Sequence, residues 1–201
     1  LDSVIASEFW EIWPTRKFLA SELEVMLESE MDYEAKLDLT RRWCKEWQFR
    51  IGVHYLRSQI SAVSAGSQYA ELAEITLNII WKEVLSEFAK KFGPEPGNGG
   101  VVIGMGSIGS GVLHANSDLD LIIIYDADGN EQSEGDRSLS ARQYYSRLTK
   151  AFITAISAPM SEGRLYEIDM RLRPSGFQGP VATSWSSYQN YQKNEAWVWE
   201  H

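Results

Sequence analysis

The sequence is organised around two neighbouring segments, Gly104-Met105-Gly106-Ser107-Ile108-Gly109-Ser110-Gly111 and Ser117-Asp118-Leu119-Asp120-Leu121-Ile122-Ile123-Ile124-Tyr125. The run Val101-Val102-Ile103 ahead of them is β-branched, apolar and bounded by glycines, which predicts a buried strand. The glycines that follow allow backbone N–H groups to come close to a ligand, because no Cβ stands in the way. Successive N–H groups that face one point form a concavity suited to phosphate. The two segments therefore predict a pair of strands joined by a phosphate-binding loop.

The second predicted strand carries two carboxylates at alternate positions, Asp118 and Asp120. Strand side chains alternate between faces, so both acids project to the same side. At a separation of ~4 Å and an effective dielectric of ~20, two such charges repel by about 4 kcal/mol. A divalent cation is the usual compensation, and Mg²⁺ is often shared between carboxylates and substrate phosphates. A phosphate-binding loop beside an acidic pair is what nucleotidyl transfer requires.

A third carboxylate is expected from a later strand, at 165–173. Its apolar positions are Tyr166, Ile168, Met170 and Leu172, and its polar positions are Glu167, Asp169, Arg171 and Arg173. This period-two pattern predicts a half-buried strand with Asp169 as the best third metal ligand. The alternative is a solvated acid paired with Arg171 or Arg173. Each arginine could equally neutralise phosphate or pair with Glu167 or Asp169.

The order of these features resembles the nucleotidyltransferase superfamily, in which a Gly-Ser at a strand end precedes an Asp-x-Asp. Here ten residues separate Gly106-Ser107 from Asp118. The resemblance implies an α+β fold with a polymerase-β-like mixed sheet, ATP as substrate and Mg²⁺, as two ions, as cofactor. The implied catalytic and metal-binding residues are Asp118, Asp120 and Asp169. The implied nucleotide-binding residues are Gly106, Ser107, Gly109, Ser110, Arg171 and Arg173.

Three longer segments, 165–176, 179–184 and 191–201, resemble the glutamine synthetase adenylyltransferase family. The resemblance implies that the acceptor is a tyrosine hydroxyl on glutamine synthetase and that the full-length enzyme responds to the PII signalling protein. The ending at 194–201 is similar to the adenylylating half of that family. Two residues depart from its loop pattern: Ser107 replaces a lysine and Ser110 replaces a glycine. The alternatives are the adenylyl-removing, phosphorolytic half and a weakened nucleotide-sensing or protein-docking module.

The bulk composition narrows the classes of partner. The net charge of −9 disfavours nucleic acid, because an acidic surface repels a phosphate backbone. Cys44 is the one cysteine, so no internal disulfide can form and a reducing, cytoplasmic setting is expected. No apolar run approaches the ~18 residues of a membrane span, and no signal-peptide pattern opens the chain. The start at Leu1 and an apparent helix running to His201 predict a fragment of a longer protein.

Three regions are expected along the chain. Residues 1–97 form a helical region, 98–183 the nucleotidyltransferase domain, and 184–201 the first helix of a truncated C-terminal helical region. The boundary at 93–100 contains two prolines and four glycines. Residues 64–68 are expected to form a turn, and Ser140 to Gln143 a capping box. An apolar stripe is predicted on the helix after Asp32, with Arg41, Arg42, Lys45 and Glu46 on its solvated face.

Overall fold

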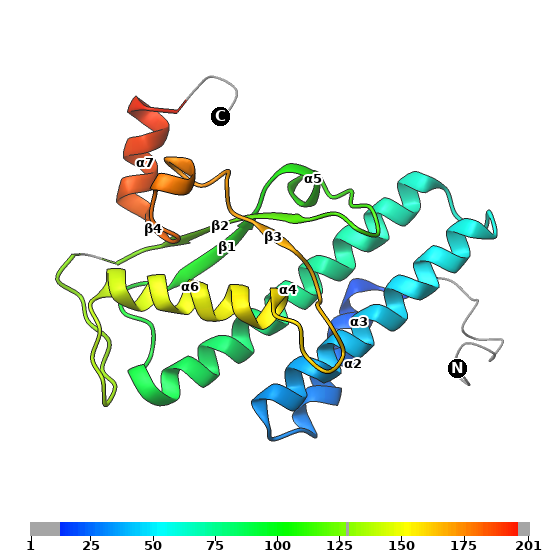
Figure 1. Ribbon diagram of the computed structural model, residues 1–201, viewed down its shortest axis with the longest axis horizontal. Helices are drawn as coiled ribbons and strands as arrows, with labels where there is room; N and C mark the ends of the chain where they lie inside the picture. The colour runs from blue at the N-terminus through cyan, green and yellow to red at the C-terminus, as the bar shows by residue number, and fades with distance from the viewer. Residues whose placement is uncertain (1–12, 128, 197–201) are drawn as a thin grey trace.

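The structure of the chain, a computed structural model, describes residues 13–127 and 129–196. It opens with three helices that pack on one another, α2 (Arg16–Glu28), α3 (Tyr33–Leu56) and α4 (Ala62–Phe92). Figure 1 shows α3 and α4 as long rods joined by a short connection. The helical N-terminal part expected from the sequence is therefore present.

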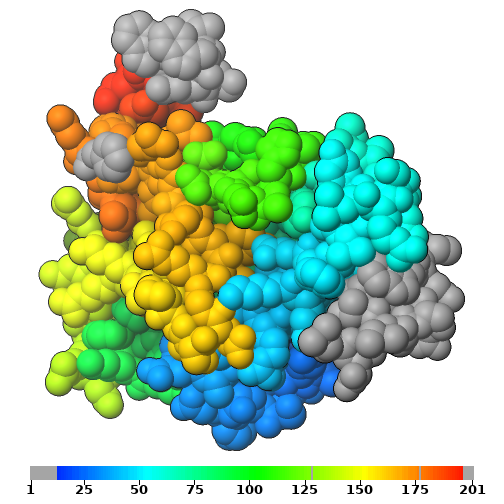
Figure 2. Space-filling view, turned by 45° about the vertical axis from the view of Figure 1, so that its right-hand side comes forward, coloured from blue at the N-terminus to red at the C-terminus, as the bar shows by residue number. Residues whose placement is uncertain are grey.

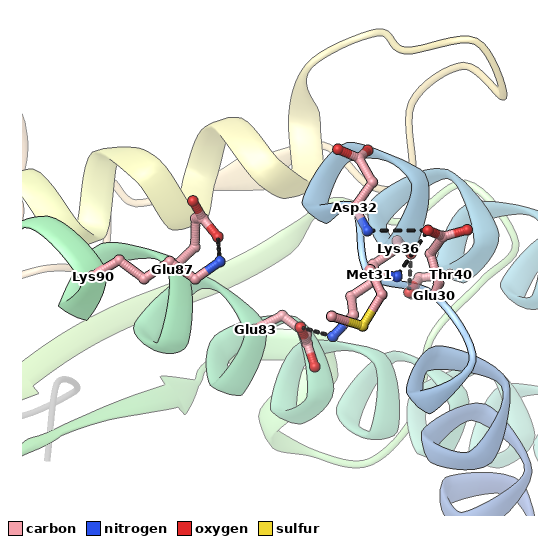
Figure 3. Close-up of polar contacts among 8 residues, drawn as sticks. All are labelled: Glu30, Met31, Asp32, Lys36, Thr40, Glu83, Glu87 and Lys90. Carbon is pink, nitrogen blue, oxygen red and sulfur yellow. Dashed lines mark hydrogen bonds and ion pairs between the residues drawn. The ribbon is translucent and has the colours of Figure 1, made fainter.

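Polar side chains define the ends of these helices. Asp32 caps α3 by accepting the N–H of Ala35 at 2.8 Å, and such a cap satisfies an N–H group that lacks a partner within the helix. Within the bundle, Lys36 of α3 forms an ion pair with Glu83 of α4 at 2.8 Å (Figure 3). Helix α4 ends at Gly93, whose φ of +84° lies in the region that favours glycine.

The turn expected at 64–68 is absent, because α4 already begins at Ala62. Ser61 caps it by accepting the N–H of Ser64 at 3.1 Å. Gly66 is instead a packing position inside the helix. A Cβ on Gly66 would lie 2.6 Å from Cγ1 of Val112. The backbone carbonyl of Gly66 accepts the N–H of Leu113 at 3.0 Å. The glycine therefore marks where the Gly-rich segment rests on α4.

The sheet has four strands, β1 (Gly100–Gly104), β2 (Leu119–Tyr125), β3 (Ile168–Asp169) and β4 (Thr183–Ser184). Strand β2 is central: β1 pairs with it antiparallel, whereas β3 and β4 pair with it in parallel at its two ends. All the residues of β2 except Asp120 are buried, as its apolar run predicts. Helices together with this mixed sheet confirm the α+β expectation.

The prediction of a long strand at 165–173 is wrong, since β3 contains only two residues. Directly after it, the Asp169 carboxylate accepts the N–H of Arg171 at 2.8 Å. A short acidic side chain that captures a nearby N–H competes with the sheet ladder and favours a turn. The chain accordingly leaves the sheet, and Leu172, expected on the buried face, is 53% exposed.

Short helices and one long helix complete the fold: α5 (Gly106–Gly109), α6 (Ala141–Ser157), the 3-10 turn η2 (Gly176–Gln178) and α7 (Trp185–Asn194). In Figure 1, α4 and α6 cross beneath the strands and α7 stands above them. Helix α6 begins after Ser140 as expected. Within the described chain, however, the Ser140 side chain makes no cap hydrogen bond, so the prediction of a capping box is wrong. Ser140 instead forms an isolated bridge with Gln132.

One continuous core joins the helical and sheet parts. Trp81 of α4 meets Phe152 of α6 edge to face, with ring centroids 5.0 Å apart. Arg41 also belongs to this core, since it is fully buried, and the expectation that it lies on a solvated face is wrong. Its spacing explains the position: it stands four residues after Leu37 and three before Cys44, on the apolar stripe of α3.

Candidate active site

The Gly-rich segment connects β1 to the acidic strand by a tight turn. The N–H of Met105 donates to the carbonyl of Asp120 at 2.8 Å, so the loop starts beside the second carboxylate. Gly106 follows with a φ of +52°, and a Cβ at that residue would lie 2.6 Å from Oδ2 of Asp120. Both the left-handed backbone and the close approach of the carboxylate require glycine here.

The remaining loop residues form the four-residue helix α5 and its end. A Cβ on Gly109 would lie 2.8 Å from the carbonyl oxygen of Gly104, so this glycine also permits a close backbone contact. The Ser110 hydroxyl donates to the carbonyl of Ser107 at 2.9 Å and closes the turn. Ser107 is exposed. The structure thus places all four expected loop residues on one turn, with Gly106 against Asp120.

The three expected carboxylates lie in one neighbourhood. Asp120 and Asp169 are partners in the parallel register of β2 and β3, and Asp118 lies one residue before β2 begins. Partial burial raises the pKa of the Asp120 carboxyl, and the negative charges of Asp169 and Asp118 raise it further, against the opposing charge of Arg171. The repulsion expected from the sequence is therefore present at Asp120.

Asp169 is held by its own neighbour in the chain. Besides the backbone N–H of Arg171, it accepts a hydrogen bond from Nε of that residue at 2.6 Å and forms an ion pair with the same guanidinium. The side-chain and backbone hydrogen bonds lower the pKa of Asp169. The structure thus contains the Asp169–Arg171 pair that was the alternative to a free metal ligand.

The second arginine supports the loop after β3. Nη1 of Arg173 donates to the carbonyl of Met170 at 2.7 Å, and its Nε donates to the carbonyl of Gly179 at 3.4 Å. Glu167, the other acid of this segment, forms an ion pair with Arg164. Arg171, by contrast, contacts the Asp169 carboxylate. The hydrogen bond to Asp169 raises the pKa of Arg171, and the charges of Asp120 and Asp118 raise it further.

The donors at this site suit a hard cation. Asp118 and Asp120 present carboxylate oxygens, which are hard ligands of the kind that a divalent cation takes. Burial is the main cause of the raised pKa of Asp120, and the neighbouring negative charges of Asp169 and Asp118 add to it. As the side chains lie, no group of three His, Cys, Asp or Glu residues in the described part of the chain is placed to hold a metal ion. In this arrangement both oxygens of the Asp169 carboxylate accept hydrogen bonds from Arg171.

Comparison with known proteins places the chain in a family. The family model of glutamate-ammonia ligase adenylyltransferase matches residues 1–201. The chain belongs to this family of nucleotidyltransferase enzymes.

Curated members of the family align along the whole chain. The relatives from Mesorhizobium japonicum, Brucella suis biovar 1 and Bradyrhizobium diazoefficiens are 43%, 44% and 40% identical over 100% of this chain. Each is described as a bifunctional glutamine synthetase adenylyltransferase/adenylyl-removing enzyme. The chain spans 20% of the length of each of these relatives. Residues 197–201, the end of the segment at 194–201 that resembles the adenylylating half, lie outside the described residues.

The sequence did not predict the hydrogen bonds that join the helical region to the segment carrying Asp169. The sequence placed Arg41 on a solvated face, yet Arg41 donates hydrogen bonds to Ala155 in α6 and to Gly163 in the segment that leads into β3. A signal was available, because the apolar stripe through Leu37 and Cys44 has Arg41 at its intervening position. A long cation on such a stripe is buried only when polar partners surround it.

Proposed function

We propose that this chain carries a nucleotidyl-transfer site that transfers AMP from ATP to a tyrosine hydroxyl of glutamine synthetase. The observation that carries the proposal is the pairing of Asp120 with Asp169 in the sheet register, beside a loop whose glycine contacts Asp120. The printed names of the relatives support glutamine synthetase as the acceptor.

In the proposed reaction the hydroxyl gives up its proton to water and its oxygen bonds to the α-phosphorus of ATP. The bond from that phosphorus to the bridging oxygen breaks, and pyrophosphate leaves. The protein contributes positioning and charge neutralisation. Asp118 and Asp120 would hold one Mg²⁺ and, together with Asp169, a second. Bound Mg²⁺ supplies positive charge at the triphosphate and lowers the pKa of the incoming hydroxyl.

The loop and the arginines would bind the triphosphate. Ser107 is exposed at the turn, where its hydroxyl and the neighbouring N–H groups can meet phosphate oxygens. The side chain of Arg171 is 64% exposed, so it can leave Asp169 and neutralise phosphate charge. The loss of the lysine that the family carries at position 107 makes Arg171 the more important cation for this chain.

The wider partners follow from the family. We propose that the full-length protein acts in the cytoplasm, responds to PII and does not bind nucleic acid, in keeping with the net charge of −9. None of the described helices is both long and apolar enough to cross a bilayer.

The first test measures transfer of label from α-labelled ATP to glutamine synthetase with Mg²⁺, using the full-length protein. Asp120→Asn is expected to lower transfer at least about 100-fold, because even groups that only orient metal ligands are worth 10- to 100-fold. Asp136→Asn, an exposed acid in the loop before α6, serves as the control and should transfer normally. Unchanged transfer by Asp120→Asn would show that the metal assignment is wrong.

The relatives' names combine two activities, so the adenylyl-removing direction is the second candidate. It uses the same carboxylates with phosphate as the attacking group, and its product is ADP. Adenylylated glutamine synthetase is incubated with phosphate and this protein, and ADP is measured. ADP release without AMP transfer from ATP would assign this chain to the removing half. Metal-dependent ATP binding with neither activity would leave a nucleotide-sensing module.

A further inference from the structure

Helix α3 lies against the segment that connects α6 to β3. In Figure 1 this segment descends from the end of α6 to α3 before it returns to the sheet, and in Figure 2 its gold surface rests on the blue surface of α3. Asp38 accepts hydrogen bonds from the Ser161 hydroxyl and, at 3.5 Å, from the N–H of Glu162. Arg42 pairs with the Glu162 carboxylate at 2.9 Å.

Arg41 is the buried centre of this contact. Its Nη1 donates to the carbonyl of Leu37 in its own helix at 2.9 Å. Its Nη2 donates to the carbonyls of Ala155 and Ala158 at 2.5 and 3.3 Å, and its Nε donates to the carbonyl of Gly163 at 3.0 Å. Ala155 lies in the last turn of α6 and Ala158 is its C-cap, where carbonyl groups lack partners within the helix. One guanidinium thus joins α3, the end of α6 and the following segment.

The same face of α3 continues toward the sheet. Three residues after Arg41, the thiol of Cys44 lies 3.3 Å from the Tyr166 hydroxyl, and both groups are buried. The next backbone contact belongs to β2, where the N–H of Leu119 donates to the carbonyl of Glu167 at 2.9 Å. The contacts that begin at Arg41 therefore reach Glu167, two residues before Asp169.

Strand β3 needs this support because it is short. Its register with β2 contains two residue pairs, and after Asp169 the chain turns away. We propose that Arg41 is a positioning residue that, through 158–166, places Asp169 opposite Asp120. The helical region is then part of the site's framework. The placement stands on the contacts alone, whereas its value for catalysis rests on the proposed function.

The test compares Arg41→Met and Arg41→Lys with the control Lys36→Met in the full chain. Lys36 lies five residues earlier on α3 and forms its ion pair with Glu83 of α4 rather than with the segment (Figure 3). Mn²⁺ binding is followed by its electron spin resonance, and amide hydrogen exchange is measured over 158–170. Mg²⁺ dependence of AMP transfer is measured in the full-length protein.

Arg41→Met is expected to speed exchange at 165–170 and weaken Mn²⁺ binding about 10- to 100-fold, the range known for groups that orient metal ligands. Arg41→Lys keeps one cationic donor and should recover part of the affinity. Lys36→Met should leave both measurements unchanged. If Arg41→Met does not fold, Tyr166→Phe removes the hydroxyl that meets Cys44. It should change the exchange rate and the Mn²⁺ affinity in the same direction as Arg41→Met, by less.

The outcomes separate this inference from the proposed function. A folded Arg41→Met with wild-type exchange at 165–170 and wild-type Mn²⁺ affinity would overturn the positioning role. Equal losses in Arg41→Met and Lys36→Met would also overturn it, because they would reflect general stability. If the wild type transfers no AMP but Arg41→Met still loosens 165–170 selectively, the proposed function fails while the positioning role stands.

Discussion

At the scale of single residues, the contact between Gly106 and Asp120 links the loop to the acidic pair. The φ of Gly106 is +52°, and an added Cβ would lie 2.6 Å from Oδ2 of Asp120. Gly111 provides a matched comparison in the same segment. Its φ is +74°, but a Cβ there would meet nothing within 4 Å. Gly106 and Gly111 therefore share a backbone conformation that a side chain would strain. At Gly106 alone of the two, an added Cβ would also collide with the Asp120 carboxylate.

We therefore predict different results for Gly106→Ala and Gly111→Ala. Each substitution should cost about 1–2 kcal/mol of stability through the left-handed backbone. Gly106→Ala should also displace Asp120 and lower Mn²⁺ affinity, because the carboxylate cannot keep its place beside a methyl group. Urea unfolding and Mn²⁺ titration check the two effects. Equal Mn²⁺ affinity in both variants would contradict a site built on the Gly106–Asp120 contact.

At the scale of elements, the helices differ in whether a side chain accepts the free backbone N–H groups of their first turn. The Asp32 side chain accepts an N–H at the start of α3, whereas the Ser140 side chain makes no cap bond at the start of α6 within the described chain. Both residues have a typical capping identity, so the sequence does not separate them. The bridge between Ser140 and Gln132 shows that the preceding loop takes part in the start of α6.

Asp32→Ala should accordingly destabilise the protein by about 0.5–2 kcal/mol, the usual loss for a side-chain cap. Ser140→Ala should change the free energy of unfolding by no more than about 0.5 kcal/mol, as for an ordinary surface substitution. Chemical denaturation of both variants, followed by tryptophan fluorescence, measures the difference. A loss of similar size at Ser140 would show that its hydroxyl caps α6 in solution.

At the scale of the whole molecule, buried polar groups join the helical region to the sheet. Cys44 of α3 and Tyr166, which precedes β3, meet in the common core. Burial raises the pKa of Cys44 to about 11. Burial, followed by the nearby Cys44, raises the pKa of the Tyr166 hydroxyl. Both groups are neutral in the folded protein at neutral pH, and ionisation of either would oppose folding.

This coupling predicts a loss of stability in alkali. The unfolded thiol ionises near pH 8.5, so the contribution of Cys44 is complete below that pH and is lost as pH rises toward 11. The slope from one such group approaches about 1.4 kcal/mol per pH unit. Cys44→Ser does not titrate in this window and should show a shallower decline in urea unfolding measured from pH 8 to 10. Identical slopes would mean that the thiol ionises freely in the folded chain.

Much of the fold and of the candidate site follows from local pattern. The run at 119–125 is apolar wherever the strand is buried, so β2 could be predicted from its composition. The β-branched run 101–103 and its flanking glycines predicted the strand β1, but the expectation that it is buried is wrong, since Val101 is 55% exposed. The order of the Gly-rich loop and the acidic pair identified the superfamily, and the longer segments after 165 identified the family. These features are encoded within a few residues of one another, which is why sequence reasoning reaches them.

The remaining features depend on partners far away in the chain. Three of the carbonyl groups that surround Arg41 lie 114 to 122 residues from it, so no local pattern shows that the guanidinium is buried rather than solvated. The alternation at 165–173 predicted a long strand, but the bond from the Arg171 N–H to Asp169 ended it after two residues. Periodicity specifies which face of a segment is apolar. Which groups meet that face, and where pairing stops, is settled by the competition for hydrogen-bond partners in the folded core.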